Sequence, residues 1–393
     1  MTERAPVITG YARTPIGGFQ GILKDFTAPE LGADAIRAAL SRSGIAPEKV
    51  DDVYMGCVLS AGLGQAPARQ AAIMAGLSPS VPCTTVSKVC GSGMKALMVA
   101  SDAVQAGSIE VAVAGGMESM TRTPYLLPKM RAGQRMGHGQ ALDHMFFDGL
   151  EDAYEKGRLM GSFAEECVRE HGFTREDQDA FALTSLRRAL IANQDGSFEA
   201  EITPVAISKK DDVAMLRMDE QPEKADKTRI PLLKPAFVSN GTITAANASS
   251  ISDGAAALVV MSWEAAEAQG VEVLGTVRGY VSHAQSPATF ATAPIGAIQK
   301  LCDRVGWNIR EVDLFEINEA FAVVTMAAMK HFGLSHEKVN VHGGACALGH
   351  PIGASGARIV VTLLAAMKKY NLKRGIASLC IGGGEATAIA VER

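Results

Sequence analysis

The chain has 393 residues, of which 47% are hydrophobic and 20% are charged, and its formal net charge is -4. This length allows two domains or one large composite domain with a sizeable core. The slightly negative charge argues against a broad basic surface for nucleic acid, so local Lys or Arg side chains must hold any anionic substrate.

The seven cysteines are scattered and form neither a CxxC pair nor a Cys/His ligand set. In a chain of this size we expect reduced thiols in the cytoplasm, with no disulfide framework and no metal site. The first residues lack the basic start and apolar run of a secretory signal, and no apolar stretch reaches membrane-spanning length. We therefore expect no membrane contact.

Short β-branched runs alternate with Ala- and Leu-rich helical stretches from the N-terminus onwards. This alternation, together with 40 glycines that fit tight turns, predicts an α/β protein whose buried, mostly parallel sheet is covered by helices. The predicted strands are 7–10, 53–56, 84–87 and 110–114, and the predicted helices are 28–43, 66–75 and a stretch after Cys90 striped by Met94, Leu97, Met98 and Val104.

The C-terminal third repeats the plan of the N-terminal third. Three matched segments keep their order at a nearly constant offset of about 265 positions, which indicates duplication and two similar halves. The matches are 50–56 with 312–318, Ser92-Gly93 with Ser355-Gly356, and 114–118 with 381–385.

The repeat divides the chain into three predicted parts. Residues 1–121, completed by 252–270, form an N-terminal domain, and residues 271–393 form a C-terminal domain. Residues 122–251 form an inserted loop domain, which is a favourable place for substrate and subunit contacts. Within it we expect an excursion outside the sheet at 122–144, helical structure at 163–192 with a cap at Thr174, and a charged loop at 219–227.

Cys90 is the first candidate for chemistry, because it follows a predicted strand and begins Cys90-Gly91-Ser92-Gly93 at the start of a helix. A free cysteine is most often a buried packing residue. Here, however, helix N-terminal amides favour a thiolate, so we expect the pKa of Cys90 to be lower than the pKa of the other six thiols. The order strand, cysteine, helix is also typical of a nucleophile elbow, so we interpret Cys90 as a nucleophile.

Three further groups accompany it. His350 lies in a loop shaped by Gly349, Pro351 and Gly353, where a neutral imidazole would deprotonate Cys90; a hydrogen-bonded core histidine is the alternative. Cys380 ends an apolar strand before a glycine run, which favours exposure at a strand end over burial. Asn318 also follows a strand and either caps the next helix or holds a water that donates to an oxyanion.

Other histidines and cysteines lack comparable surroundings. His342 is the main competitor of His350, and the glycine run after Cys380 is a weak candidate for a phosphate cradle because it lacks a Walker lysine and the GxGxxG spacing. The cysteines interpreted as packing residues are Cys57, Cys83, Cys167, Cys302 and Cys346.

In combination these motifs resemble those of thiolases of the acetyl-CoA acetyltransferase type, over essentially the full chain. The matching motifs are Cys90-Gly91-Ser92-Gly93, Asn318-Glu319-Ala320-Phe321, Gly349-His350-Pro351 and Cys380-Ile381-Gly382. The resemblance implies a thiolase-like α/β fold with two similar β/α halves, mixed sheets covered by helices, and an inserted loop domain.

The resemblance also implies a role for each group. Cys90 would be the acylated nucleophile, His350 its activator, and Cys380 the acid/base of carbon–carbon bond formation. Asn318 would hold a water in one oxyanion hole with His350, and the amides of Cys90 and Gly382 would form the other. The CoA and acyl contacts implied are Ser249 in the segment Asn247-Ala248-Ser249, Phe237, Ala320, Phe321, Met160, Leu159 and Phe290. Leu159 stands where many members have His, and Phe290 where many have Met.

The implied activity is that of an acyltransferase, the reversible Claisen condensation of two acetyl-CoA molecules to acetoacetyl-CoA and CoA. CoA is a substrate, and neither a metal nor a separate cofactor is needed. A homotetramer or dimer is implied, with 122–144 as the tetramerisation loop. Alternatives are a broader-range degradative 3-ketoacyl-CoA thiolase, a decarboxylating ketoacyl synthase, against which Cys380 argues, and a non-catalytic acyl-CoA or lipid carrier.

Overall fold

The computed structural model describes residues 3–209 and 212–393. Within these ranges ten strands form one sheet in the order β12-β13-β14-β11-β1-β10-β5-β3-β4, with β2 paired to β10. The strands are β1 (Pro6–Arg13), β2 (Gly17–Gly18), β3 (Asp52–Gly56), β4 (Cys83–Val86), β5 (Val111–Ser119), β10 (Ser252–Ser262), β11 (Gly275–Ala284), β12 (Leu314–Ile317), β13 (Arg374–Ile381) and β14 (Glu385–Glu392).

The sheet is mixed, and the prediction of a mostly parallel sheet is wrong. Only β3–β4, β3–β5 and β12–β13 pair in parallel, at the two ends of the sheet. Its centre is antiparallel, through β10, β1, β11 and β14. The local β/α alternation could not reveal this, because β10 returns to the sheet only after the long insertion and β14 follows β13 through a tight turn.

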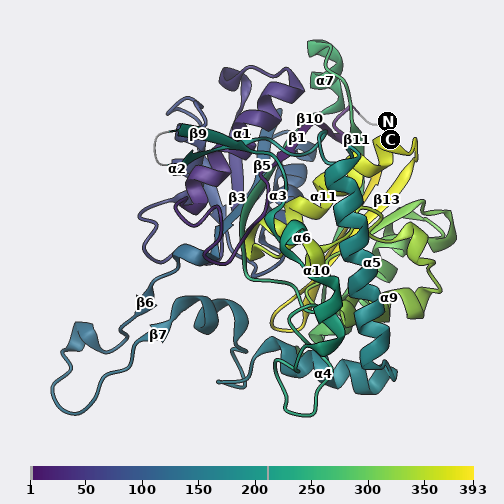
Figure 1. Ribbon diagram of the computed structural model, residues 1–393. Helices are drawn as coiled ribbons and strands as arrows, with labels where there is room; N and C mark the ends of the chain where they lie inside the picture. Colours follow the sequence, from purple (N-terminus) through teal and green to yellow (C-terminus); the bar gives the residue numbers. More distant parts are fainter. Residues whose placement is uncertain (1–2, 210–211) are drawn as a thin grey trace.

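Helices cover and separate the two halves of the sheet (Figure 1). Helices α1 and α2 pack on the N-terminal half and α8 packs on β11, β13 and β14 of the C-terminal half. Helices α3 and α11 contact each other, and α11 contacts β5 and β10 on one side and β12 and β13 on the other. Helix α11 is buried along Ile352–Met367, as expected for a helix enclosed by protein on all sides. The helices are α1 (Ala28–Ser43), α2 (Pro67–Met74), α3 (Ser92–Gln105), α7 (Trp263–Gln269), α8 (Ala293–Val305), α9 (Ala322–Phe332), α10 (Ala345–Leu348) and α11 (Ile352–Lys369).

The repeated Ser-Gly pairs explain how the two halves meet. A Cβ added at Gly93 in α3 would lie 2.8 Å from the backbone nitrogen of Ala357 in α11. A Cβ added at Gly356 in α11 would lie 2.5 Å from the backbone nitrogen of Met94 in α3. The two helices therefore cross in backbone contact near their N-termini, which brings the residues that precede each helix, Cys90 and His350, to one place.

The insertion contains more regular structure than the sequence indicated. Helical structure is confirmed, but it is broken at Gly172, whose φ is 66°, and Thr174 caps the second helix as predicted. The prediction of a charged loop at 219–227 is wrong in part, because α6 occupies most of this segment and Asp219 is buried beside Arg13. The elements are β6 (Tyr125–Leu126), β7 (Leu142–Asp143), α4 (Met160–His171), α5 (Arg175–Gln194), β8 (Val205–Lys209), β9 (Asp212–Leu216) and α6 (Glu220–Lys224).

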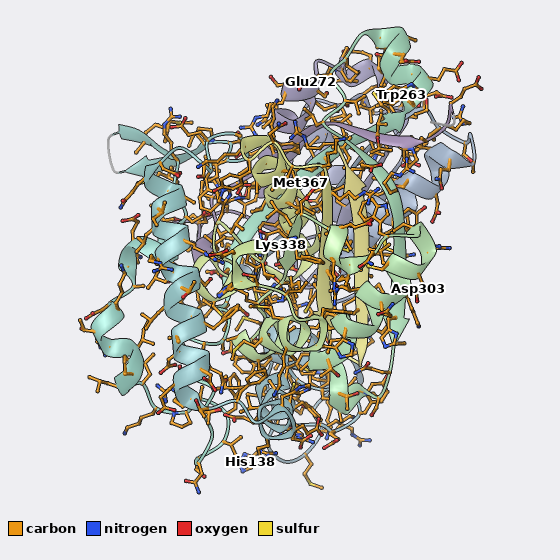
Figure 2. The ribbon with its side chains drawn as sticks, turned by 90° about the vertical axis from the view of Figure 1, so that its right-hand side faces the viewer. His138, Trp263, Glu272, Asp303, Lys338 and Met367 are labelled. Carbon is orange, nitrogen blue, oxygen red and sulfur yellow. The ribbon has the colours of Figure 1, made fainter. Side chains whose placement is uncertain are left out.

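The segment 122–144 extends away from the sheet, as predicted, although β6 and β7 pair as a short ladder within it (Figure 1). Figure 2 shows His138 of this excursion at the opposite end of the molecule from Trp263 of α7. Among the described residues, no helix combines the length and the apolar character that a membrane crossing requires.

Candidate active site

One cavity of about 430 Å³ collects nearly all of the side chains singled out from the sequence. Its volume lies in the range of small-molecule sites. The residues from that set that line it are Cys90, His350, Cys380, Gly382, Ser249, Phe237, Ala320, Phe321, Met160, Leu159 and Phe290. Segments more than 200 positions apart in the chain therefore share one site, whereas Asn318 lies outside the cavity wall.

Cys90 sits on a strained turn between β4 and α3. The preceding residue, Val89, has a φ of 45°, which is unfavourable for a β-branched side chain. Ser92 stabilises the turn, because its hydroxyl accepts from the Lys88 amide at 2.8 Å and donates to the Val89 carbonyl at 2.7 Å. A strained strand–helix turn that presents a nucleophile is the geometry expected of an elbow.

The pKa of Cys90 lies above its ordinary value, but it is raised less than the pKa of Cys57 or Cys167, which is the direction predicted relative to other thiols. Burial raises the pKa of this thiol to about 11, although the amides of Gly382 and of Cys90 itself act in the opposite direction. The surrounding protein outweighs the amides because it removes much of the water that would solvate a thiolate, although Cys90 stays partly exposed to the cavity. Cys90 is therefore a neutral thiol in the free protein and needs a base to become a nucleophile.

His350 has the position and the neutral protonation state that such a base requires. Its Nδ1 lies 2.6 Å from the Ser355 hydroxyl, whose single proton is donated to the Pro351 carbonyl at 3.0 Å. Nδ1 must therefore carry the proton and donate, which leaves Nε2 with a free lone pair. Burial, and then the charge of Arg358, lower the pKa of His350 to about 3, so the imidazole is neutral near pH 7.

Nε2 is buried and has no hydrogen-bond partner among residues 3–209 and 212–393. The structure thus places His350 in the cavity wall with a free acceptor nitrogen. Its competitor, His342, is hydrogen-bonded to the Tyr370 hydroxyl at 3.2 Å and does not line the cavity.

Cys380 lies at the end of β13 and lines the cavity, but its predicted exposure is wrong, since only 1% of the residue is exposed. Burial, and then the proximity of Cys90, raise the pKa of the Cys380 thiol well above its ordinary value. The strand ends in a tight turn in which Gly383 and Gly384 have φ values of 90° and 86°. This turn directs the Gly382 amide back towards the Cys90 sulfur.

Asn318 follows β12 and lies behind the cavity wall, with 1% of the residue exposed. It does not cap a helix, because α9 begins at Ala322 and Phe321 holds the capping position. Its side-chain oxygen accepts from Arg358 at 3.2 Å, and its Nδ2 has no hydrogen-bond partner in the described chain. The helix-cap interpretation is thereby removed.

Hydrogen bonds join the 247–249 segment to the Asn318–Phe321 motif. The amide and the hydroxyl of Ser249 both donate to the Ala320 carbonyl at 3.0 Å. Phe321 stands between two other rings, with centroid distances of 5.7 Å to Phe237 and 6.2 Å to Phe290, both in edge contact. Leu159 and Met160 close another side at the start of α4.

Sequence reasoning missed part of the wall and some supporting residues. Phe146, Leu150 and Ile352 line the cavity, and the first two come from the insertion, whose chain path no local pattern revealed. Glu118 is buried and accepts from the amides of Val58, Leu59 and Gly353, so it ties the start of α11 to the end of β3. Burial raises the pKa of Glu118 to about 7.

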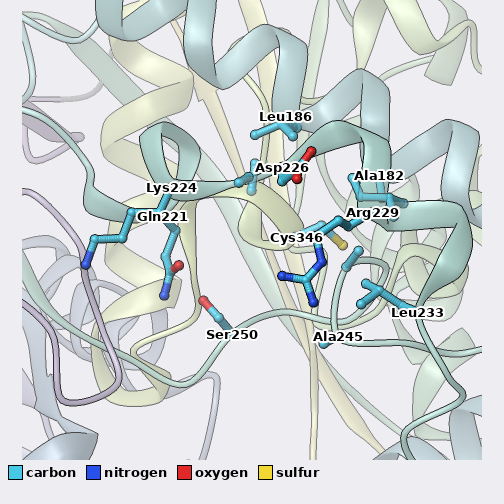
Figure 3. A pocket seen from close by; sticks show the side chains of 14 residues that line it. Ala182, Leu186, Gln221, Lys224, Asp226, Arg229, Leu233, Ala245, Ser250 and Cys346 are labelled. Carbon is cyan, nitrogen blue, oxygen red and sulfur yellow. The ribbon is translucent and has the colours of Figure 1, made fainter.

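A second cavity of about 330 Å³ adjoins the first and shares Ala245 and Ser250 with it. Lys224, Asp226 and Arg229 contribute charged side chains to it (Figure 3). Cys346, which we had interpreted as a packing residue, lines this second cavity.

A cysteine on a strained turn, a neutral imidazole and a second thiol around one cavity define a cysteine-dependent acyl-transfer site. Comparison of the chain with known protein families supports this class of site. The model of the thiolase N-terminal domain matches residues 6–264, and that of the thiolase C-terminal domain matches residues 271–393.

Individual relatives extend over the whole chain. An acetyl-CoA acetyltransferase of Cupriavidus necator is 49% identical over 98% of this chain and 99% of its own. Acetyl-CoA acetyltransferase 2 of Arabidopsis thaliana is 50% identical over 100% of this chain and 98% of its own.

Solved structures give the same result. The acetyl-CoA acetyltransferase of Bacillus anthracis has a TM-score of 0.95 and 41% identity, covering 99% of this chain and 98% of its own. The Acat5 thiolase of Ascaris suum in complex with coenzyme A has a TM-score of 0.93 and 40% identity, covering 99% and 100%. The chain belongs to the thiolase family.

Proposed function

We propose that this thiolase is an acetyl-CoA C-acetyltransferase, which condenses two acetyl-CoA molecules reversibly to acetoacetyl-CoA and CoA through an acetyl-Cys90 intermediate. The observation that carries the proposal is the single cavity that holds Cys90, the neutral imidazole of His350 and the Cys380 thiol. Relatives that carry the name acetyl-CoA acetyltransferase support the choice of acyl group.

Acyl transfer begins with the Cys90 thiol. His350 Nε2 takes its proton as the sulfur attacks the thioester carbonyl of acetyl-CoA, and the amides of Cys90 and Gly382 stabilise the negative oxygen. The carbon–sulfur bond to CoA then breaks. The departing CoA thiolate takes a proton from Cys380, which leaves an acetyl-Cys90 thioester, a His350 imidazolium and a Cys380 thiolate.

Condensation uses that thiolate, because the raised pKa of Cys380 makes it a strong base once its proton has gone. It removes the α-proton of a second acetyl-CoA, and the carbanion attacks acetyl-Cys90. Acetoacetyl-CoA is released as the Cys90 sulfur recovers a proton from His350. The enolate oxygen is stabilised by His350 and by Asn318 acting through a water, which fits the place of Asn318 behind the cavity wall. No step requires a metal or a further cofactor.

The second cavity offers room for the nucleotide end of CoA, since it adjoins the wall that contains Ser249. Arg229 lines this second cavity and supplies a cation for the phosphates of CoA. A local cation is needed because the chain as a whole carries a small negative charge and does not attract phosphates. The structure of the Ascaris suum relative with coenzyme A supports CoA as a ligand.

We also infer a cytoplasmic homotetramer. The excursion 122–144 exposes apolar side chains at Tyr125, Leu127, Met130 and Met136, with exposed fractions of 68%, 50%, 53% and 96%, and a surface of this kind favours contact with another copy. The seven cysteines are free thiols, which fits a reducing compartment.

One assay separates the candidate functions. Acetoacetyl-CoA and CoA are supplied together, and acetyl-CoA formation is followed; in parallel, acetyl-CoA is supplied with a malonyl thioester. We expect rapid formation of acetyl-CoA and no dependence on the malonyl thioester. Consumption of the malonyl thioester alone would indicate a decarboxylating ketoacyl synthase. Tight binding of acyl-CoA without turnover would indicate a carrier.

A further inference from the structure

Arg358 is a buried cation close to the active site that the proposed chemistry does not yet use. It lies in α11, one turn beyond Ser355, and only 2% of the residue is exposed. Its Nη1 lies 3.7 Å from a carboxylate oxygen of Glu316 in β12, and its Nη2 donates to the Asn318 side-chain oxygen at 3.2 Å. Its Nε and Nη1 have no hydrogen-bond partner within the described ranges.

Stability does not explain this arginine. A buried ion pair loses much of its attraction to desolvation, and well-packed apolar residues often replace such a pair without loss. With two of its nitrogens lacking hydrogen bonds, the guanidinium is incompletely satisfied where it lies. Among the described residues, Arg358 donates to the side chain of Asn318. We therefore look for the function of Arg358 in its effect on Asn318.

The chemistry of arginine fixes how that amide is turned. A guanidinium has donors and no acceptor, so the atom of Asn318 that faces it must be the oxygen. Nδ2 therefore points away from Arg358, and it is buried without a partner among the described residues. The backbone amide of Asn318 is held separately, by the Ser378 carbonyl at 3.0 Å. The contact with Arg358 is thus what orients the side chain.

We propose that Arg358 is a positioning residue for condensation: its guanidinium, which lies beside Glu316, turns the amide of Asn318 so that Nδ2 stays free to donate towards the reacting oxyanion. This inference rests on the proposed function. Arg358 also favours the neutral state of His350, since burial and the charge of Arg358 lower the pKa of that imidazole.

The test measures the two half-reactions separately in Arg358→Met, in Asn318→Ala and in the double variant. Acylation is followed as acetyl-Cys90 formed from labelled acetyl-CoA, and condensation as acetoacetyl-CoA formed afterwards. Misplacing a group in an active site slows a reaction by roughly 10²-fold. We therefore expect Arg358→Met to slow condensation by about 10-fold to 100-fold and acylation by less than about 3-fold.

The double variant supplies the sharper criterion. If Arg358 acts through Asn318, Arg358→Met should have little further effect on condensation when Asn318 is already Ala. Arg358→Lys keeps the positive charge and a hydrogen-bond donor group and should recover part of the rate. Thr362→Val, on the same face of α11 and buried, is the matched control for disturbed packing and should leave the ratio of the two half-reactions unchanged.

Thermal melting shows whether each variant folds. If Arg358→Met alone does not fold, the double variant Glu316→Gln and Arg358→Met replaces both members of this buried pair, and the same ratio is measured there. Equal slowing of both half-reactions, or full additivity with Asn318→Ala, would overturn the positioning role. A wild-type chain that forms no acetyl-Cys90 would instead refute the proposed function.

Discussion

Phe290 allows the sharpest prediction about acyl chain length. It lies in a short helix before α8, lines the cavity, and is only 2% exposed. Its ring packs edge-on against Phe321, with a centroid distance of 6.2 Å. A rigid ring at this position shortens the acyl pocket, so we predict that the wild-type protein prefers acetoacetyl-CoA and that Phe290→Ala accepts longer chains.

The magnitude follows from the methylene groups that the ring excludes. Each excluded methylene changes discrimination by about 1–3 kcal/mol. 3-Ketohexanoyl-CoA carries two more methylenes than acetoacetyl-CoA, so the wild-type preference should be about 2–6 kcal/mol, or roughly 30-fold to 10⁴-fold in kcat/KM. Phe290→Ala should reduce this preference by at least about 10-fold.

The assay compares kcat/KM for thiolysis of the two substrates in the wild type, Phe290→Ala and Phe237→Ala. Phe237 is the matched control, because it packs edge-on against Phe321 as Phe290 does, at 5.7 Å. Its loss should raise KM for both substrates and leave their ratio unchanged. A wild-type kcat/KM higher for 3-ketohexanoyl-CoA than for acetoacetyl-CoA would refute the reasoning, since the ring would then not limit the pocket.

Further predictions test the catalytic groups. Brief exposure to labelled acetyl-CoA followed by peptide mapping should place the label on Cys90, and label chiefly on Cys380 would reverse the assignment. Cys380→Ala should still form acetyl-Cys90, because the departing CoA thiolate can take its proton from water, but it should condense roughly 10²-fold to 10⁴-fold more slowly, and near-normal condensation would contradict the two-thiol mechanism. His350→Ala should slow both half-reactions and Asn318→Ala mainly condensation, so an identical pattern in the two variants would show that their roles are not divided. Because the lowered pKa of His350, about 3, keeps the base form present until the pH falls towards that value, acylation should be nearly constant from about pH 5 to about pH 8. A decline with an apparent pKa near the ordinary value of about 6.5 would contradict this, and repeating the profile in Glu118→Gln separates the titration of that neighbouring carboxyl.

The sequence by itself determined many local elements and singled out a set of residues that, apart from Asn318, all line one cavity. Helix α1 has the bounds that its apolar spacing predicts, because Thr27 caps one end and Gly44 ends the other with a φ of 71°. The motifs around Cys90, His350 and Cys380 indicated reactive groups, since small residues beside a thiol or an imidazole leave room for a substrate. The division into three domains stays a prediction, as do the individual roles of the site residues.

Only the tertiary structure decided the electrostatics of these groups and the shape of the sheet. The pKa of Cys90 depends on how much protein surrounds the thiol, which outweighs the helix-start amides that the sequence made visible. The antiparallel centre of the sheet depends on where β10 returns after the insertion. Arg358 in α11 reaches Asn318 at the end of β12 from 40 positions away, and no local pattern records a contact of that kind. Burial and long-range contacts depend on residues that are far apart in the sequence. The sequence could therefore indicate the reactive groups, whereas their protonation states and orientations depend on the fold.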